Sequence, residues 1–78
     1  MWERLIEKAR ALGPIREGRY RVMVIEGNLQ TTNRDFEDLK SAKAYADDAA
    51  SETDDAPPVA VVLDDRFNVV HEGQPYYA

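Results

Sequence analysis

The chain has 78 residues, no cysteine and a formal net charge of −5, and this length fits one domain with a small hydrophobic core. Without cysteine there is no disulfide, no thiolate zinc site and no thiol nucleophile, and a reducing compartment is expected. The apolar runs are far shorter than the roughly 20 residues of a membrane span, and the start, MWERLIEKAR, is too charged for a secretory signal. These features predict a cytoplasmic protein without a membrane segment.

Charge is distributed unevenly along the chain. Residues 1–34 carry seven basic and four acidic side chains, whereas residues 35–78 carry three basic and eleven acidic ones. The first part therefore has a net charge of +3 and the second a net charge of −8. Such an asymmetry can steer a charged partner or allow contact between two copies of the chain.

Residues 1–13 are predicted to form an amphipathic helix. Apolar side chains recur there at the spacing of one helical stripe: they are Trp2, Leu5, Ile6, Ala9 and Leu12. Gly13 and Pro14 then end the helix. Because so short a helix is marginal alone in water, its stripe must pack on the sheet of the same chain or on a second chain. Trp2, Leu5 and Ile6 are the candidate residues for this hydrophobic interface.

The segment from Tyr20 to Glu26 is predicted to be a strand that is largely apolar on both faces. Its alternation separates two sets of side chains, Tyr20, Val22 and Val24 on one face and Arg21, Met23 and Ile25 on the other. Gly27 and Asn28 favour a hairpin turn, so Leu29 to Arg34 is predicted to return as an edge strand or an extended loop. In the alternative, the next helix starts at Thr32 or Asn33 and no return strand exists.

The segment from Phe36 to Glu52 is predicted to be the second helix, with Asp38 as its N-cap and Phe36 packed against its first turn. One face carries mostly small side chains: Leu39, Ala42, Ala46, Ala49 and Ala50. Alanines let a helix axis come close to a sheet, which favours a helix-on-sheet layer. The opposite face is polar, with Glu37, Ser41, Asp48 and Glu52. Pro57 and Pro58 prevent the helix from continuing.

The segment from Val59 to Glu72 is predicted to be a second hairpin. On its first arm, Val59, Val61 and Leu63 point one way and Ala60 and Val62 the other, as in a strand that is covered on both faces. The turn is predicted at Asp64, Asp65 and Arg66. On the return arm, Phe67, Val69 and His71 are expected to share one face.

Together these elements predict a single α+β domain with the order helix, hairpin, helix, hairpin (αββαββ). Residues 1–13 form the N-terminal helix, residues 19–73 a ββαββ core and residues 74–78 a tail. The sheet is antiparallel with three or four strands, and the second helix covers one of its faces. The doubly apolar strands require a cover on the other face, either the N-terminal helix or a partner molecule.

Few residues favour catalysis. His71 is the one histidine, and nothing in the spacing pairs it with a nucleophile. Acidic pairs occur at 47–48, 54–55 and 64–65, but none has the alternating ligands and central glycine of a calcium loop. The sequence also has no motif for nucleotide binding or for standard hydrolase chemistry. We therefore predict no catalytic residue, no cofactor and no metal ligand.

Basic and aromatic side chains alternate near the first strand, a combination typical of nucleic-acid contacts. They are Arg16, Arg19, Tyr20 and Arg21. Because the net negative charge of the chain opposes a phosphate backbone, direct nucleic-acid binding is not expected.

The sequence favours a small non-catalytic module that binds another protein, and a homodimer is one form of such binding. In one alternative, acidic side chains occupy the basic nucleic-acid site of a target protein, as a nucleic-acid mimic does. The candidate residues for partner binding are Glu37, Asp48, Glu52, Asp54 and Asp55. In the other alternative, the chain is a small enzyme or an enzyme subunit.

Overall fold

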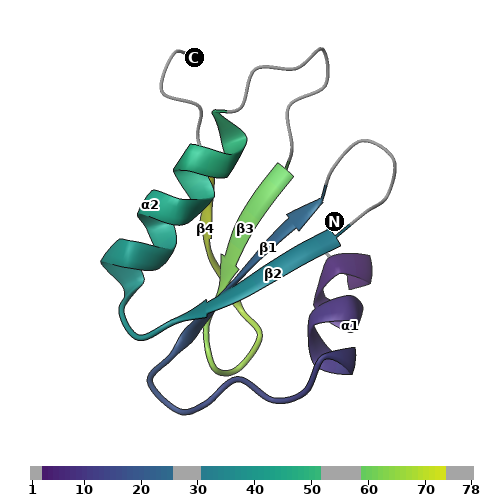
Figure 1. The fold of residues 1–78 in the computed structure, drawn as a ribbon. Coiled ribbons are helices and arrows are strands. Elements are labelled where there is room, and N and C mark those ends of the chain that lie inside the picture. Colours follow the sequence, from purple (N-terminus) through teal and green to yellow (C-terminus); the bar gives the residue numbers. More distant parts are fainter. Residues whose placement is uncertain (1–2, 26–30, 52–58, 74–78) are drawn as a thin grey trace.

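The computed structural model describes residues 3–25, 31–51 and 59–73, which form two helices and four strands (Figure 1). The helices are α1 (Glu3–Ala11) and α2 (Leu39–Ala50), and the strands are β1 (Tyr20–Ile25), β2 (Thr31–Phe36), β3 (Val59–Leu63) and β4 (Val69–Glu72). The predicted α+β fold with the order αββαββ is confirmed.

The four strands form one antiparallel sheet in the order β2-β1-β3-β4. The two most apolar strands, β1 and β3, lie in the middle and pair directly, with Val22 opposite Val62 and Met23 opposite Val61. β2 and β4 are the edge strands (Figure 1). This order places the apolar strands where they can be covered on both faces.

The segment after the first strand returns as a strand of the sheet. β2 pairs with β1 from Thr31 to Phe36 without a register shift, so the alternative in which the helix starts at Thr32 or Asn33 is wrong. The strand extends to Phe36 instead of ending at Arg34. The predicted turn at 27–28 and residue 29 lie outside the described residues.

Each face of the sheet is covered by one helix of the same chain. The buried cluster on one face, called here the α1 side, consists of Leu5, Ala9, Ile15, Met23, Val61 and Leu63. The buried cluster on the other face, the α2 side, consists of Val22, Val24, Ala42, Ala46, Ala60 and Val62. The alternation predicted for the two central strands is therefore confirmed.

The N-terminal helix packs on its own sheet. Leu5 and Ala9 are buried, and Ile6 is partly buried against the α1-side cluster. Trp2, the third candidate for a hydrophobic interface, lies outside the described residues. The two candidates that the structure describes thus belong to the core of the chain, and the α1 side does not require a partner molecule to cover it.

The start of α2 is fixed by a capping hydrogen bond. Asp38 is the N-cap, and its carboxylate accepts the N–H of Ser41 at 2.9 Å. This hydrogen bond holds the pKa of Asp38 below its ordinary value. The predicted N-cap is therefore confirmed and the helix begins at Leu39, whereas the predicted helical segment started at Phe36. Phe36 ends β2, and its ring contacts Tyr45, with the ring centroids 5.2 Å apart.

The chain after β4 passes very close to α2. The Gly73 N–H donates to the Ala60 carbonyl at 2.8 Å, and a Cβ placed on Gly73 would lie 2.5 Å from the Ala46 carbonyl oxygen. It would also lie 3.2 Å from the Cβ of Ala50. Only glycine fits at this position, because helix backbone and side chain leave no room for another carbon atom.

Gly73→Ala is therefore expected to destabilise the domain by about 1–3 kcal/mol, the usual cost of overpacking. Chemical denaturation followed by circular dichroism measures this loss. Val70→Ala is the control, because Val70 is an exposed residue of β4 and surface substitutions usually change stability by no more than about 0.5 kcal/mol. Equal stability of the two variants would show that β4 can move away from α2 at no cost.

A β-bulge in β4 turns His71 toward α2. The register between β3 and β4 shifts at Val62 and Leu63, because His71 lies opposite Val62 while Val69 lies opposite Leu63. Val70 is thus the extra residue. Phe67 and Val69 pack on the α1 side, whereas His71 reaches Asp47 of α2. The expectation that His71 shares their face is wrong, because the bulge reverses the alternation.

The tip of the second hairpin is organised by Asp64, and the predicted turn at residues 64–66 is confirmed. The Asp64 carboxylate accepts the N–H groups of Arg66 at 2.9 Å and Asn68 at 2.8 Å. Partial burial acts to raise the pKa of Asp64, but the N–H groups of Asn68 and Arg66 outweigh it, so the pKa lies below its ordinary value. Phe67 has a φ of 63°, and the Arg10 guanidinium lies 5.4 Å from the centroid of its ring.

Candidate protein-binding surface

The acidic residues that the sequence proposed for partner binding are only partly described. Glu37 is exposed and lies between β2 and α2, where it forms an ion pair with Arg19 at 3.3 Å. Asp48 is exposed on α2. The remaining candidates, Glu52, Asp54 and Asp55, lie outside the described residues. Because the helix begins after Glu37, this side chain is not part of a helical row with Asp48.

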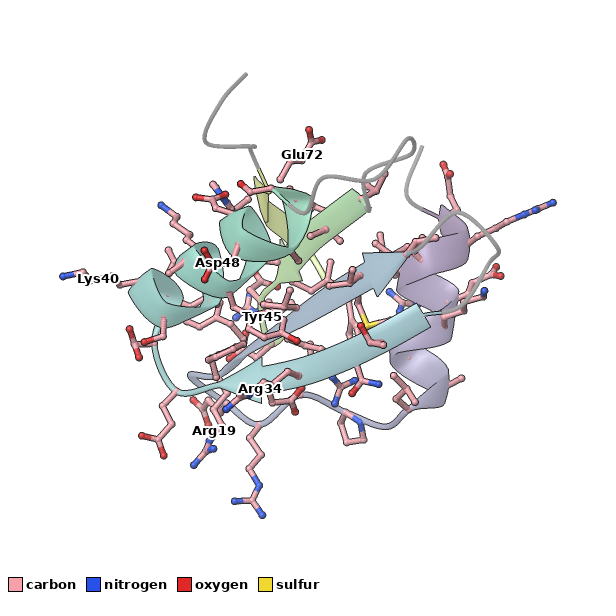
Figure 2. The ribbon with its side chains drawn as sticks, turned by 45° about the horizontal axis from the view of Figure 1, so that its top comes forward. Arg19, Arg34, Lys40, Tyr45, Asp48 and Glu72 are labelled. Carbon is pink, nitrogen blue, oxygen red and sulfur yellow. The ribbon has the colours of Figure 1, made fainter. Side chains whose placement is uncertain are left out.

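The exposed side of α2 carries charges of both signs. Lys40, Lys43 and Asp48 are all exposed there, and Figure 2 shows Lys40 near the start of the helix and Asp48 further along it. The described part of α2 is therefore not a continuous row of carboxylates. The nucleic-acid mimic hypothesis depends on residues 52–55, which the structure does not describe, and it stays a prediction.

The one histidine pairs with an aspartate. His71 Nε2 lies 2.9 Å from Asp47 Oδ1, and both side chains are partly buried between β4 and α2. The nearby hydroxyl of Ser51 donates to the Asp47 carbonyl at 2.8 Å. Within residues 3–25, 31–51 and 59–73, no three acidic, histidine or cysteine side chains are placed so that they can hold a metal ion. We interpret the pair as a contact that joins the last strand to α2.

Arg21 has a structural role that the sequence did not indicate. Its side chain is only 6% exposed and points to the α1 side. It binds both carboxylate oxygens of Asp35 at 2.8 and 3.2 Å, and it donates to the carbonyls of Ala9 and Gly13 at the end of α1. One side chain thus joins α1, β1 and β2. Of the three arginines that could contact phosphate, Arg21 is therefore buried, and only Arg16 and Arg19 remain.

The two edges of the sheet differ. β4 is short, and a bulge interrupts its pairing with β3. β2 has six residues in continuous register with β1, and Thr32, Asn33, Arg34 and Asp35 are exposed. In the described part of the chain, no strand pairs with the outer side of β2. A long, regular edge of this kind is a template for another strand, whereas a bulge protects an edge.

Side chains on β2 alternate between the two sides of the sheet. Residues opposite each other in an antiparallel pair share a face. Arg34 lies opposite Val22, so it points to the α2 side, and Asp35 lies opposite Arg21 on the α1 side. A strand added beside β2 would therefore meet Thr32, Arg34 and Phe36 on one face and Asn33 and Asp35 on the other.

Arg34 and two aromatic rings form a cluster at this edge, called here the Arg34 cluster. The guanidinium carbon of Arg34 lies 5.3 Å from the centroid of the Phe36 ring and 5.7 Å from that of Tyr45. Figure 2 shows Arg34 on β2 below Tyr45 on α2, with Arg19 nearby. Cation–π contacts at exposed sites contribute about 0.5–1 kcal/mol each. Arginine and tyrosine are also enriched among the residues that dominate protein interfaces.

The sequence contained only part of the signal for this cluster. Arg34 and Phe36 are two residues apart, which places them on one face once the segment is known to be a strand. Tyr45 joins them because α2 crosses this face of the sheet. Its contact with β2 could not be inferred without knowing how the helix lies on the strands.

Comparison with family models, with curated proteins and with solved structures finds no match for this chain. Neither α1 nor α2, the helices in the described ranges, is long and apolar enough to cross a membrane. The geometry and charge of the surface around β2 are therefore the basis for a functional proposal.

Proposed function

We propose that the chain is a small non-catalytic protein-binding module of the cytoplasm and that it binds its partner along the outer edge of β2. The observation that carries the proposal is that only one part of the sheet, the β2 edge, is both regular and uncovered in the described part of the chain. Both faces are covered by helices of the same chain, and one edge is interrupted by a bulge. The other edge is regular, exposed and bordered by the Arg34 cluster.

Strand addition at a sheet edge is a recurring way in which proteins recognise extended segments. Main-chain hydrogen bonds supply affinity, and alternate side chains supply specificity. The β2 edge offers both, since its side chains differ on the two faces. A second copy of the chain can use the same edge, so the partner is another protein or the chain itself.

Site-specific photocrosslinking tests this proposal. We expect a photoreactive amino acid at the exposed position Thr32 of β2 to give one discrete adduct in cells that make the protein. The same group at the exposed position Lys8 of α1 is expected to give none of comparable yield. Excess co-expressed protein without the photoreactive group should compete for the Thr32 adduct.

The mass of the adduct separates the two kinds of partner. A product of twice the chain mass identifies a second copy, and any other mass identifies a different protein. Adducts of equal yield at both positions, or none at Thr32, would contradict the proposal that β2 is the binding edge.

A further inference from the structure

We infer that the β2 edge binds an extended acidic segment of another protein, with a glutamate or aspartate opposite Arg34. This inference rests on the proposed function and specifies the chemistry of its partner.

Among the described residues of this edge, Arg34 is the charged side chain that lacks a counter-ion. Two other arginines nearby are already engaged, since Arg21 binds Asp35 and Arg19 binds Glu37. Among the described residues, no carboxylate lies within ion-pair distance of the Arg34 guanidinium. A strand beside β2 brings its side chains to about 4.5–5.5 Å between Cβ atoms, close enough for a carboxylate to pair with Arg34.

The aromatic rings make Arg34 a better binding group. A free arginine side chain must be ordered when it binds, which reduces the affinity. The contacts with Phe36 and Tyr45 hold the guanidinium over the rings before a partner arrives. On the same face, the partner residue two positions from the acidic one lies opposite Phe36. An apolar side chain is favoured there, because aromatic and β-branched residues pair well across strands.

A second copy of the chain fits this edge less well. Antiparallel pairing of two β2 strands about a two-fold axis places one residue opposite itself. An axis at Arg34 opposes two guanidinium groups, and an axis at Asp35 opposes two carboxylates, and both arrangements are unfavourable. An axis at Asn33 places Arg34 opposite Thr32. None of these registers gives Arg34 a carboxylate.

Three synthetic peptides test the inference: SVTETVS, SVTQTVS and SVTKTVS, each acetylated and amidated. Each pattern is symmetric about its central residue, so the test does not depend on strand direction. Titration of the ¹⁵N-labelled protein, followed by NMR, reports the dissociation constant and the amides that shift. We expect shifts centred on residues 31–36 and binding of the glutamate peptide about threefold to tenfold tighter than that of the lysine peptide.

A charge reversal gives the decisive comparison. Arg34→Glu is expected to reverse the preference, so that the lysine peptide binds tighter. Arg4→Glu makes the same change in total charge at an exposed position of α1 and is expected to keep the original preference. Circular dichroism checks that both variants remain folded.

The outcomes separate the inference from the proposed function. Equal binding of the three peptides, no binding at all, or an unchanged preference in Arg34→Glu would overturn the acidic partner. Shifts of the β2 amides with protein concentration alone would identify a second copy as the occupant and would also overturn it. If one of these results is found together with a Thr32 adduct, the acidic partner is wrong but β2 remains the binding edge. If no Thr32 adduct forms, the proposed function is wrong as well.

Discussion

Val61→Asp is expected to unfold the domain. The Val61 side chain has no exposed surface, and it lies in the α1-side cluster with Met23 opposite it on β1. A carboxylate at this position would be buried without a partner, and an uncompensated buried charge costs several kcal/mol even after its surroundings relax. A chain of this size has about 5 kcal/mol of stability or little more, so the variant should lose its cooperative thermal transition in circular dichroism.

Val59→Asp is the matched control for this experiment. Val59 is on the same strand but is 46% exposed, so its carboxylate remains in contact with water. We expect Val59→Asp to change the stability by no more than about 1 kcal/mol. A folded Val61→Asp variant with a melting temperature near that of the parent would mean that α1 does not cover this face in solution.

Arg21→Ala is expected to destabilise the domain by about 2–4 kcal/mol. The substitution removes the hydrogen bonds to Asp35 and to the Ala9 and Gly13 carbonyls. The Gly13 carbonyl then loses the hydrogen bond from Arg21, and the Ala9 carbonyl keeps only the longer hydrogen bond from the Leu12 N–H at 3.3 Å. The positive charge of Arg21 also lies at the C-terminus of α1, where the helix dipole favours a cation. Urea denaturation with a two-state fit measures the loss.

Arg19→Ala supplies the comparison for Arg21. Arg19 also pairs with an acidic side chain, but Glu37 is 79% exposed, and exposed ion pairs contribute about 0–1 kcal/mol. We therefore expect Arg19→Ala to have a much smaller effect on the free energy of unfolding than Arg21→Ala. Similar losses for the two variants would show that the buried hydrogen bonds of Arg21 do not hold α1 on the sheet.

Local sequence patterns predicted the helices and strands because each pattern has a direct physical cause. The alternation in VAVVL predicted a strand covered on both faces, and Val61 and Ala60 are indeed buried on opposite sides. Asp38 predicted the start of α2 because a carboxylate there can bind the free N–H groups of the first turn. These signals depend only on neighbouring residues.

The errors and omissions involve contacts between distant segments. His71 lies on the face opposite to the predicted one because one extra residue in β4 reverses the alternation, and no composition signal marks the bulge. In the sequence, Arg21 resembles the surface arginines near it, because its partners, Asp35 and the end of α1, come together only in the folded chain. The sequence does not reveal the Arg34 cluster for the same reason, since Tyr45 reaches it from α2.

The difference between the two edges of the sheet also limits how the molecule can assemble. Fibres built from sheets grow because every added copy presents a fresh edge to the next one. Here the bulge at Val70 interrupts the β4 edge, so two copies that pair through β2 leave only their β4 edges, which are poorer templates. If β2 is the binding edge, as proposed, association of two copies through their strand edges is a closed, single step and does not continue into a fibre.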